Sequence, residues 1–440
     1  MRKFFRLPAT ATAPFCPSET GGSIEVPKKA SLWKKLAIFV GPGLLVSVGY
    51  MDPGNWATDI EAGSKFGYSL LSIVLFSSLA AMFLQCITLK VGIVTKRDLA
   101  QLCRDHFPKK LNTILWLLAE VAIIACDVAE VLGAALAFKL LLGVSLKLGI
   151  ILTAFDTILV LGLQGNGFRR IEAIVLGLIL TICGCFIGEL IFVQPHWPSV
   201  MAGFIPRVQT LAHHDAWYLA IGILGATVMP HNLFLHSSII QTRKIGPSVS
   251  EKKSAIRLNT FDTVVSLSLA FLVNCAILIL AGAAFHHTGN NTVAGIDEAY
   301  HLLDPLVGGT IAGLLFGIAL LAAGQSSTFT GTIAGQVVME GFMNWKIPCW
   351  QRRVITRGLA LIPAYIGVMI FGDNSTGRLL VLSQVILSLQ LPFTIFPLLL
   401  FARNKKLMGD FSLLPVTQIF AWLLLIVIVV ANGVLLVGLL

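Results

Sequence analysis

The chain has 440 residues, of which 56% are apolar and only 12% are charged. Soluble proteins carry about 25% charged residues, so this composition excludes a soluble enzyme, a disordered chain and a secreted disulfide scaffold. A membrane-spanning helix needs about 20 apolar residues, and the apolar content is enough for about eleven such helices. We therefore expect an all-α polytopic membrane protein whose core is the interior of a helix bundle.

The chain begins with a polar tail, residues 1–35, which contains four prolines and no apolar run long enough for a signal peptide. We expect this tail to be disordered and cytoplasmic. Residues 36–440 form a single transmembrane domain, because the apolar segments are evenly spaced and joined by short connections. These eleven predicted segments lie near 39–64, 69–94, 112–138, 148–164, 171–193, 216–241, 259–286, 306–339, 354–371, 379–402 and 414–440.

The basic residues predict the orientation, because loops on the cytoplasmic side are enriched in Lys and Arg. With the N-terminus inside, only five of the 32 basic residues fall on the outer side, namely Lys65, Lys139, Lys147, Arg207 and Arg378. The C-terminus is then outside, and we expect a multi-pass protein of the plasma membrane. This distribution also accounts for the net charge of +10 without a nucleic-acid partner. The eight cysteines form no CxxC pair and are expected to be small buried apolar residues.

Two segments carry a proline-centred interruption. The first reads Asp52-Pro53-Gly54-Asn55 and the second Met229-Pro230-His231-Asn232. One proline alone would be explained as a kink, because it removes a backbone donor and clashes with the preceding turn. Two interruptions at corresponding places in two halves predict a midplane binding site in a transporter built from inverted repeats. The first repeat would cover about 39–193, the second about 216–402, and 414–440 would be an additional helix.

The residues at these interruptions predict which ligand binds. Asp52 offers a carboxylate, Asn55 an amide oxygen and Met229 a thioether, and unwinding exposes backbone carbonyls near Gly49 and Ala226. One charge, several neutral oxygens and one sulfur suit a divalent transition metal such as Mn²⁺ or Fe²⁺. Mg²⁺ and Ca²⁺ prefer an all-oxygen shell. An amino-acid substrate would favour a helix N-terminus without a carboxylate beside it.

The two interruptions resemble the signature motifs of the Nramp family, whose members are proton-coupled manganese and iron transporters with a LeuT-like fold. The resemblance covers nearly all of residues 36–440. Further stretches that resemble the family are GIVTKRDLAQL, AEVAIIACDVAEVLGAALA, LLAAGQSSTFTGTIAGQ, RRVITRGLALIPA and LVLSQVILSLQLPF. The resemblance implies a LeuT-like arrangement of five plus five helices and an eleventh, with the first and sixth helices broken in mid-membrane.

The resemblance also implies a set of site residues. The metal ligands would be the side chains of Asp52, Asn55 and Met229 and the carbonyl of Ala226. Gln384 in SQVILS would join them when the outer gate closes, with Gln390 as the alternative. Gly49 and Gln85 would be gate or second-shell residues.

A proton route is predicted beside this site. Glu120, Asp127 and Glu130 share one helical face, and Arg352 and Arg353 begin a later segment. Acidic and basic faces within one membrane are expected to meet as ion pairs. For Glu120 and Arg352, purely structural pairing remains an equal alternative. For Asp127 and Glu130 we expect a proton relay, in line with the family.

His231, two residues after Met229, could start this relay because histidine titrates in the physiological range. The sequence therefore predicts a secondary transporter that imports Mn²⁺ or Fe²⁺, and also Cd²⁺ or Co²⁺, with protons across the lipid bilayer. No GxxxxGK[ST] motif for ATP occurs, and no HExxH motif indicates a metalloenzyme. The alternatives are an amino-acid or Na⁺-coupled permease on the same fold and a membrane receptor that senses metal without moving it. We expect no resident cofactor and see no indication of an oligomer.

Overall fold

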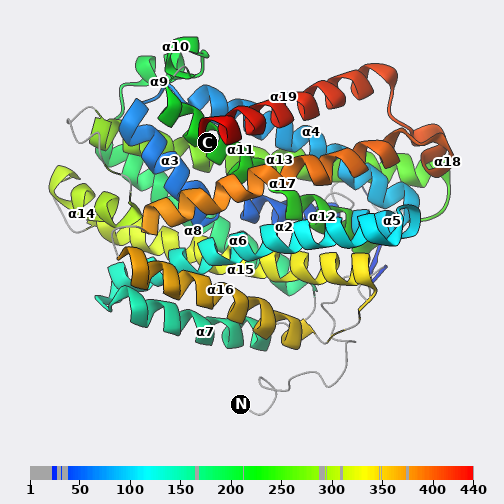
Figure 1. Cartoon of the computed structure of the whole chain (residues 1–440), viewed down its shortest axis with the longest axis horizontal. Helices are drawn as coiled ribbons and strands as arrows, with labels where there is room; N and C mark the ends of the chain where they lie inside the picture. Colours follow the sequence, from blue (N-terminus) through cyan, green and yellow to red (C-terminus); the bar gives the residue numbers. More distant parts are fainter. Residues whose placement is uncertain are drawn as a thin grey trace.

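The chain is a bundle of long helices (Figure 1). The computed structural model describes residues 22–439 except for 27–30, 32–37, 164–167, 212, 287–292, 294, 308–310, 346, 348 and 373–375. The predicted tail 1–35 lies mostly outside the described residues. Of that tail, the structure describes a short strand β1 (Ile24–Glu25), which pairs in parallel with β2 (Arg243–Lys244).

A helix or a pair of helices occupies each predicted apolar segment. The single helices are α4 (Leu71–Thr95), α6 (Lys109–Leu142), α7 (Leu146–Leu163), α8 (Phe168–Val193), α13 (Val249–Ala281), α15 (Ile311–Met343), α16 (Cys349–Phe371), α17 (Thr376–Arg403) and α19 (Pro415–Leu439). Two segments are pairs, α2 (Pro42–Gly49) with α3 (Pro53–Phe66), and α11 (His214–Val228) with α12 (Pro230–Ile239).

In the described part of the chain, eight helical spans are long and apolar enough to cross a membrane. The span over α11 and α12 is one of them, whereas α2 and α3 are each too short to count. A further apolar helix, Val354–Ile370, also falls below the length required. The described residues therefore form a mostly helical bundle with eight candidate membrane spans, and the count of eleven spans stays a prediction.

The outer surface of the bundle is apolar, as lipid contact requires. Helix α19 illustrates this: Val416, Ile419 and Leu423 are more than half exposed, whereas Leu424 and Ile428 face the interior and are buried. Exposed apolar surface on this scale is rare on a soluble monomer. A set of polar side chains instead lies buried inside the bundle, including Asp127 and Glu130 of α6 and Ser326 and Thr330 of α15.

The two interruptions lie deep in the bundle. Helix α2 ends at Gly49 and α3 begins at Pro53, with Asp52 as the N-cap; helix α12 begins at Pro230. A proline in the first turn of a helix costs no hydrogen bond, because that N–H has no intrahelical partner. Met229 joins α11 to α12 with φ of 35°, in the left-handed region. Every residue of α2 and α12 is buried.

Short helices at the two ends of the bundle were not predicted from the sequence. Helices α5 (Leu99–His106) and α18 (Lys405–Met408) lie at one end, and α9 (Trp197–Gly203), α10 (Val208–Leu211) and α14 (Ile296–Val307) lie at the other (Figure 1). Helical turns of other types span Ile240–Thr242, Gly282–His286 and Gly409–Phe411. These elements are too short or too polar to give an apolar run, so hydropathy alone does not reveal them.

Candidate metal-transport site

Residues of the two interruptions meet through the side chain of Asn55. Its amide nitrogen Nδ2 donates to Asp52 Oδ1 at 2.7 Å and to the carbonyl oxygen of Ala226 at 3.0 Å. The Asn55 backbone N–H also donates to Asp52 Oδ1, at 2.9 Å, as expected for an N-cap. Two of the predicted ligands, Asp52 and Ala226, therefore lie within hydrogen-bonding distance of the side-chain amide of a third, Asn55.

Met229 lies at the same junction. Its sulfur accepts a hydrogen bond of 3.4 Å from Asn232 Nδ2, and its side chain is fully buried. Asn232 in turn packs against Gly49, where an added Cβ would lie only 2.3 Å from Asn232 Nδ2. Gly49 therefore allows the end of α2 to approach the start of α12 closely. The structure gives this predicted gate residue a packing role.

Gln384 of α17, more than 300 residues after the first interruption, reaches the same place. A Cβ added to Gly54 would lie 1.8 Å from Gln384 Nε2, so the glutamine rests directly on the first turn of α3. Gln384 is fully buried, and its Nε2 donates to Ser383 Oγ at 2.9 Å. The alternative, Gln390, instead accepts a hydrogen bond from Thr394 on its own helix.

Several oxygens here are buried without a hydrogen-bond partner among the described residues: Asp52 Oδ2, Thr227 Oγ1 and Gln384 Oε1. Such oxygens are costly to bury unless something compensates them. A divalent cation would do so, and the carbonyl of Ala226 and the sulfur of Met229 are further donors at these interruptions. Turning the Asn55 amide by 180° would present Oδ1 in place of Nδ2 to the same neighbours.

The described residues contain no group of three or more His, Cys, Asp or Glu side chains placed to hold a metal ion. The candidate site differs from such clusters because it has a single carboxylate, with amides, a carbonyl and a thioether completing the donor set. This composition fits a cation that binds and leaves rather than a tightly held structural ion, since few formal charges bind it.

Asn274 of α13 is a site residue that the sequence reasoning missed. Its Nδ2 donates to the carbonyl of Tyr50 at 3.0 Å and to Asn55 Oδ1 at 3.3 Å, and its Oδ1 has no partner in the described part of the chain. A buried asparagine within an apolar helix was the available signal. Asn274 therefore contacts the oxygen of the Asn55 amide, whereas Ala226 contacts its nitrogen, and the two together position this amide.

Gln85 does not bond to the predicted ligands but links the surrounding helices. Its Nε2 donates to the Tyr50 hydroxyl at 2.8 Å, and its Oε1 lies 2.9 Å from His236 Nδ1. His236 Nε2 lies 3.5 Å from Thr263 Oγ1. Helices α4, α12 and α13 are thereby joined to the end of α2, which is the position expected of a second-shell residue.

The predicted proton route begins on α12. His231 is buried, and its Nε2 lies 3.7 Å from Cys126 Sγ. The same sulfur lies 4.0 Å from Glu130 Oε1, and Glu130 Oε2 lies 3.9 Å from Arg357 Nη1. Cys126 therefore connects His231 to Glu130, a link that sequence spacing did not reveal. Asp127 and Glu130 both approach Gly331 of α15.

A second ion pair joins Glu120 of α6 to Arg352 of α16. Arg352 Nη2 lies 2.8 Å and 2.5 Å from the two carboxylate oxygens of Glu120. Trp116 Nε1 also donates to Glu120, at 2.9 Å, so the carboxylate is held on both sides. The side chain of Arg353 lies outside the described residues. The acidic face of α6 and the basic start of α16 thus meet, as predicted.

The overall fold is similar to that of two solved proteins of low sequence identity. They are MhsT in complex with L-phenylalanine, with a TM-score of 0.59 over 90% of this chain and 97% of that chain, and Mhp1, a nucleobase–cation symporter, with 0.58 over 90% and 92%. Each is 15% identical to this chain. The chain therefore shares its fold with these two proteins.

The family follows from closer matches. Residues 43–438 match the Nramp model, natural resistance-associated macrophage protein-like, and the chain belongs to this family of transporters. It is 62% identical to the divalent metal cation transporter MntH 1 of Pseudomonas aeruginosa, over 97% of this chain and 98% of that protein. It is 61% identical to MntH of Ralstonia nicotianae, with the same two coverages. A crystal structure of the Eremococcus coleocola manganese transporter matches with a TM-score of 0.87 and 40% identity, over 94% of this chain and 89% of that one.

Proposed function

We propose that this protein is a secondary transporter that imports divalent transition metal ions, Mn²⁺ or Fe²⁺ and also Co²⁺ or Cd²⁺, together with protons. The observation that carries the proposal is the meeting of Asp52, Asn55 and Ala226 at the two helix interruptions. Helix ends that face one another inside a membrane bundle are the expected place for an ion that crosses by alternating access. The names of the relatives support a divalent metal as the substrate.

The donor set supports a transition metal. Asp52, Asn55 and the Ala226 carbonyl offer oxygens, and Met229 offers sulfur. Gln384 packs against Gly54 in the first turn of α3. A thioether contributes little to Ca²⁺ or Mg²⁺, which bind through oxygen alone. It is a better ligand for softer ions, and for Cd²⁺ above all.

The chain of groups from His231 to Arg357 supports coupling to protons. The Cys126 thiol, the Glu130 carboxylate and the Arg357 guanidinium follow one another at separations of 3.7 to 4.0 Å. His231, Cys126 and Glu130 can accept and release protons, whereas the Arg357 guanidinium stays protonated and would stabilise the charged form of Glu130. Titratable groups along one line inside a membrane are a recurrent feature of proton-coupled transporters. Asp127 and the Glu120–Arg352 pair would extend this route along α6 and α16.

We place the protein in the plasma membrane with its N-terminus in the cytoplasm and its C-terminus outside. The distribution of basic residues supports this orientation. The end of the bundle that carries α5 and α18 would then be cytoplasmic. The end that carries α9, α10 and α14 would be external.

Reconstitution into proteoliposomes tests the proposal. A Mn²⁺-sensitive dye and a pH-sensitive dye are enclosed in separate vesicle preparations, and a membrane potential that is negative inside is imposed. We expect Mn²⁺ entry and Mn²⁺-dependent acidification of the lumen, and no entry of Ca²⁺. Mn²⁺ entry without any acidification would support metal transport and reject proton coupling. If none of the metals entered, the transport function would be rejected.

A further inference from the structure

Helix α5 begins within the segment GIVTKRDLAQL and lies at one end of the bundle (Figure 1). Neither the candidate metal site nor the proposed proton route includes a residue of α5. Asp98 is its N-cap: Asp98 Oδ1 accepts from the Gln101 backbone N–H at 2.8 Å, and Gln101 Oε1 accepts from the Asp98 N–H at 3.3 Å. This reciprocal capping box stabilises the start of a helix that has only eight residues.

The first turn of α5 is fastened to α12. The backbone N–H of Leu99 donates to Ser237 Oγ at 2.9 Å, and both groups are buried. Because the Asp98 cap determines where the first N–H groups of α5 point, the cap also positions this hydrogen bond. Helix α12 carries His231 and begins beside Met229, so α5 is attached directly to the element that contains the candidate site.

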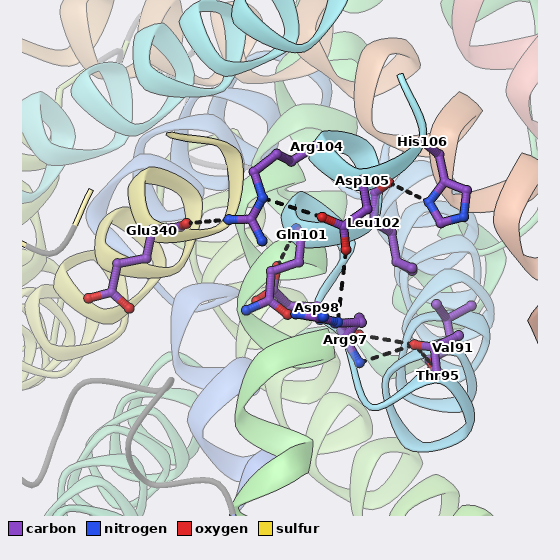
Figure 2. A network of polar contacts seen from close by, with 10 residues as sticks. All are labelled: Val91, Thr95, Arg97, Asp98, Gln101, Leu102, Arg104, Asp105, His106 and Glu340. Atoms are coloured by element: carbon purple, nitrogen blue, oxygen red, sulfur yellow. Dashed lines mark hydrogen bonds and ion pairs between the residues drawn. The ribbon is translucent and has the colours of Figure 1, made fainter. Parts of the chain in front are cut away.

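The other side of α5 is fastened to α15. Arg104 Nη1 donates to the carbonyl oxygen of Glu340 at 3.1 Å (Figure 2). Gly341 follows, and a Cβ on it would lie 2.4 Å from Ala100 Cβ and 2.9 Å from Asp98 Oδ1. Helix α5 is therefore held between α12 and α15, with Asp98 enclosed at the contact and only 5% exposed.

We infer that α5 is a proton-dependent clamp on α12, in which Asp98 is the positioning residue that senses the pH at this end of the bundle. The inference rests on the proposed function in one respect, since it takes α12 to move during transport. Asp98 is buried while α5 is docked between α12 and α15, and it would meet water if α5 left both helices. A carboxyl group that is buried in one state and hydrated in the other makes the equilibrium between them depend on pH.

The charged groups around Asp98 are few. Arg104 and the Cys103 thiol approach it from α5 itself, and Glu340 approaches it from α15. On α12 the group in contact with α5 is the uncharged Ser237, whose neighbour His236 is engaged with Gln85 of α4. Arg97 pairs instead with Asp105, at 3.8 Å.

The direction of the pH effect follows from these surroundings. Burial raises the pKa of Asp98 to about 7. The hydrogen bond from the Gln101 backbone and the positive charge of Arg104 act in the opposite direction and lower this pKa. A hydrated aspartate has a pKa of about 3.9. The docked state therefore binds the proton more tightly, so acid stabilises docking. Raising the pH from about 4 to about 7 progressively favours release, and above that range the effect levels off.

Hydrogen exchange of the full-length protein in lipid nanodiscs tests the clamp. The measured quantity is the protection of the amides of α5, corrected for the intrinsic exchange rate at each pH. We expect protection in the wild type to fall roughly 30-fold between pH 5.5 and pH 8, as the two pKa values require. Protection that does not change over this range would overturn the inference.

Three variants separate the proton from the cap. Asp98→Asn keeps an N-cap acceptor but cannot titrate, so its protection should not vary with pH, whereas Asp98→Ala loses the cap and should be poorly protected throughout. Burial is the main cause of the raised pKa of Asp98, and the negative charge of Glu340 adds to it. Glu340→Gln removes that charge, so the midpoint should move to lower pH. The inference fails if Asp98→Asn keeps the wild-type pH dependence, or, should that variant not fold, if Glu340→Gln leaves the midpoint unchanged.

Transport provides a separate readout. Mn²⁺ uptake is measured with the same pH on both sides of the vesicle, and the wild-type rate is divided by that of Asp98→Asn to cancel the titration of other groups. We expect this ratio to rise several-fold from pH 6 to pH 8, and a constant ratio would contradict a role for the clamp in transport. If the wild type neither binds nor moves Mn²⁺ at any pH, the proposed function fails while the exchange result still decides whether the clamp exists.

Discussion

The side-chain amide of Gln384 lies directly on the α-carbon of Gly54, with no room for a methyl group between them. The first residue belongs to α17 and the second to the first turn of α3, just after the Asp52 N-cap. This relationship connects the two halves of the chain at the candidate metal site. It also explains why the first interruption contains a glycine between Pro53 and Asn55.

Gly54→Ala should displace Gln384 without unfolding the protein. The new Cβ would collide with the flexible end of the glutamine side chain, which can rotate away, and not with backbone. If Gln384 helps to bind the cation, Mn²⁺ affinity measured by calorimetric titration should fall by about tenfold, which corresponds to about 1.4 kcal/mol.

Gly324→Ala is the matched control, because a Cβ there would meet Ala134 at an ordinary 3.5 Å. It should bind Mn²⁺ as the wild type does. Wild-type affinity in Gly54→Ala would show that Gln384 is packing and not a ligand.

Asp52→Ala should abolish Mn²⁺ transport and leave the protein folded. Asp52 supplies the only formal charge among the proposed ligands, and one of its oxygens is buried without a partner among the described residues. Loss of the only charge on a site built from neutral donors should lower Mn²⁺ affinity by more than about tenfold, or 1.4 kcal/mol. Calorimetric titration and thermal unfolding of the same sample check both parts, and unchanged Mn²⁺ binding would refute the assignment of the site.

Met229→Ala should keep transition-metal transport but let Ca²⁺ compete more strongly with Mn²⁺. Ca²⁺ gains almost nothing from sulfur, and a water molecule in the space left by the side chain would be a good ligand for it. The thioether therefore discriminates against the abundant ion more than it assists the scarce one. Cd²⁺ affinity should fall more than Mn²⁺ affinity, because Cd²⁺ is the softer ion.

The measurement is Mn²⁺ uptake in the presence of millimolar Ca²⁺, together with titrations of Cd²⁺ and Mn²⁺. Met339→Ala, at a buried methionine of α15, controls for the loss of a large apolar side chain. Equal Ca²⁺ competition and undiminished Cd²⁺ binding in Met229→Ala would mean that Met229 only packs.

Glu130→Gln should impair proton flux more than metal binding. The amide preserves the shape of the side chain near Cys126 and Arg357 but cannot exchange a proton. Lumen acidification should fall severalfold while Mn²⁺ affinity stays within about twofold of the wild type, a difference below about 0.5 kcal/mol. Arg352→Ala, which breaks the pair with Glu120, should act in the same direction.

Glu189→Gln is the control for this experiment. Glu189 is a buried acid on α8 whose two oxygens have no hydrogen-bond partner in the described part of the chain, and no contact connects it to the His231 chain. Its acidification rate should match the wild type. The relay lies elsewhere if Glu130→Gln and Arg352→Ala both acidify vesicles normally.

Hydropathy and the positions of the prolines predicted much of the fold. A helix needs its apolar residues in an uninterrupted run to satisfy the backbone within lipid, so each such run predicted a helix, and the helices begin and end within a few residues of the expected places for most runs. Pro53 and Pro230 cannot continue a helix, and α2 and α11 end just before them. The short helices α5, α9, α10, α14 and α18 lie outside these runs and were missed.

The candidate site was predictable only in part. Asp52, Asn55 and Met229 stand out in the sequence because polar or sulfur-containing side chains flank a proline within an apolar run. Asn274 is marked only as a polar residue in an apolar helix, and Cys126 is not marked at all. Each gains its importance from a partner on a different helix. For the same reason, the sequence alone could not choose between Gln384 and Gln390.

What the sequence determined by itself is therefore local: the membrane-spanning segments, the positions of the interruptions and the chemical type of the donors. These follow from interactions between neighbours along the chain, such as backbone satisfaction and proline geometry. The tertiary structure decided which groups meet, including Gln384 with Gly54, Cys126 with His231 and Leu99 of α5 with Ser237. Helix rotation and register set these contacts, and both depend on the packing of the whole bundle and not on any one segment.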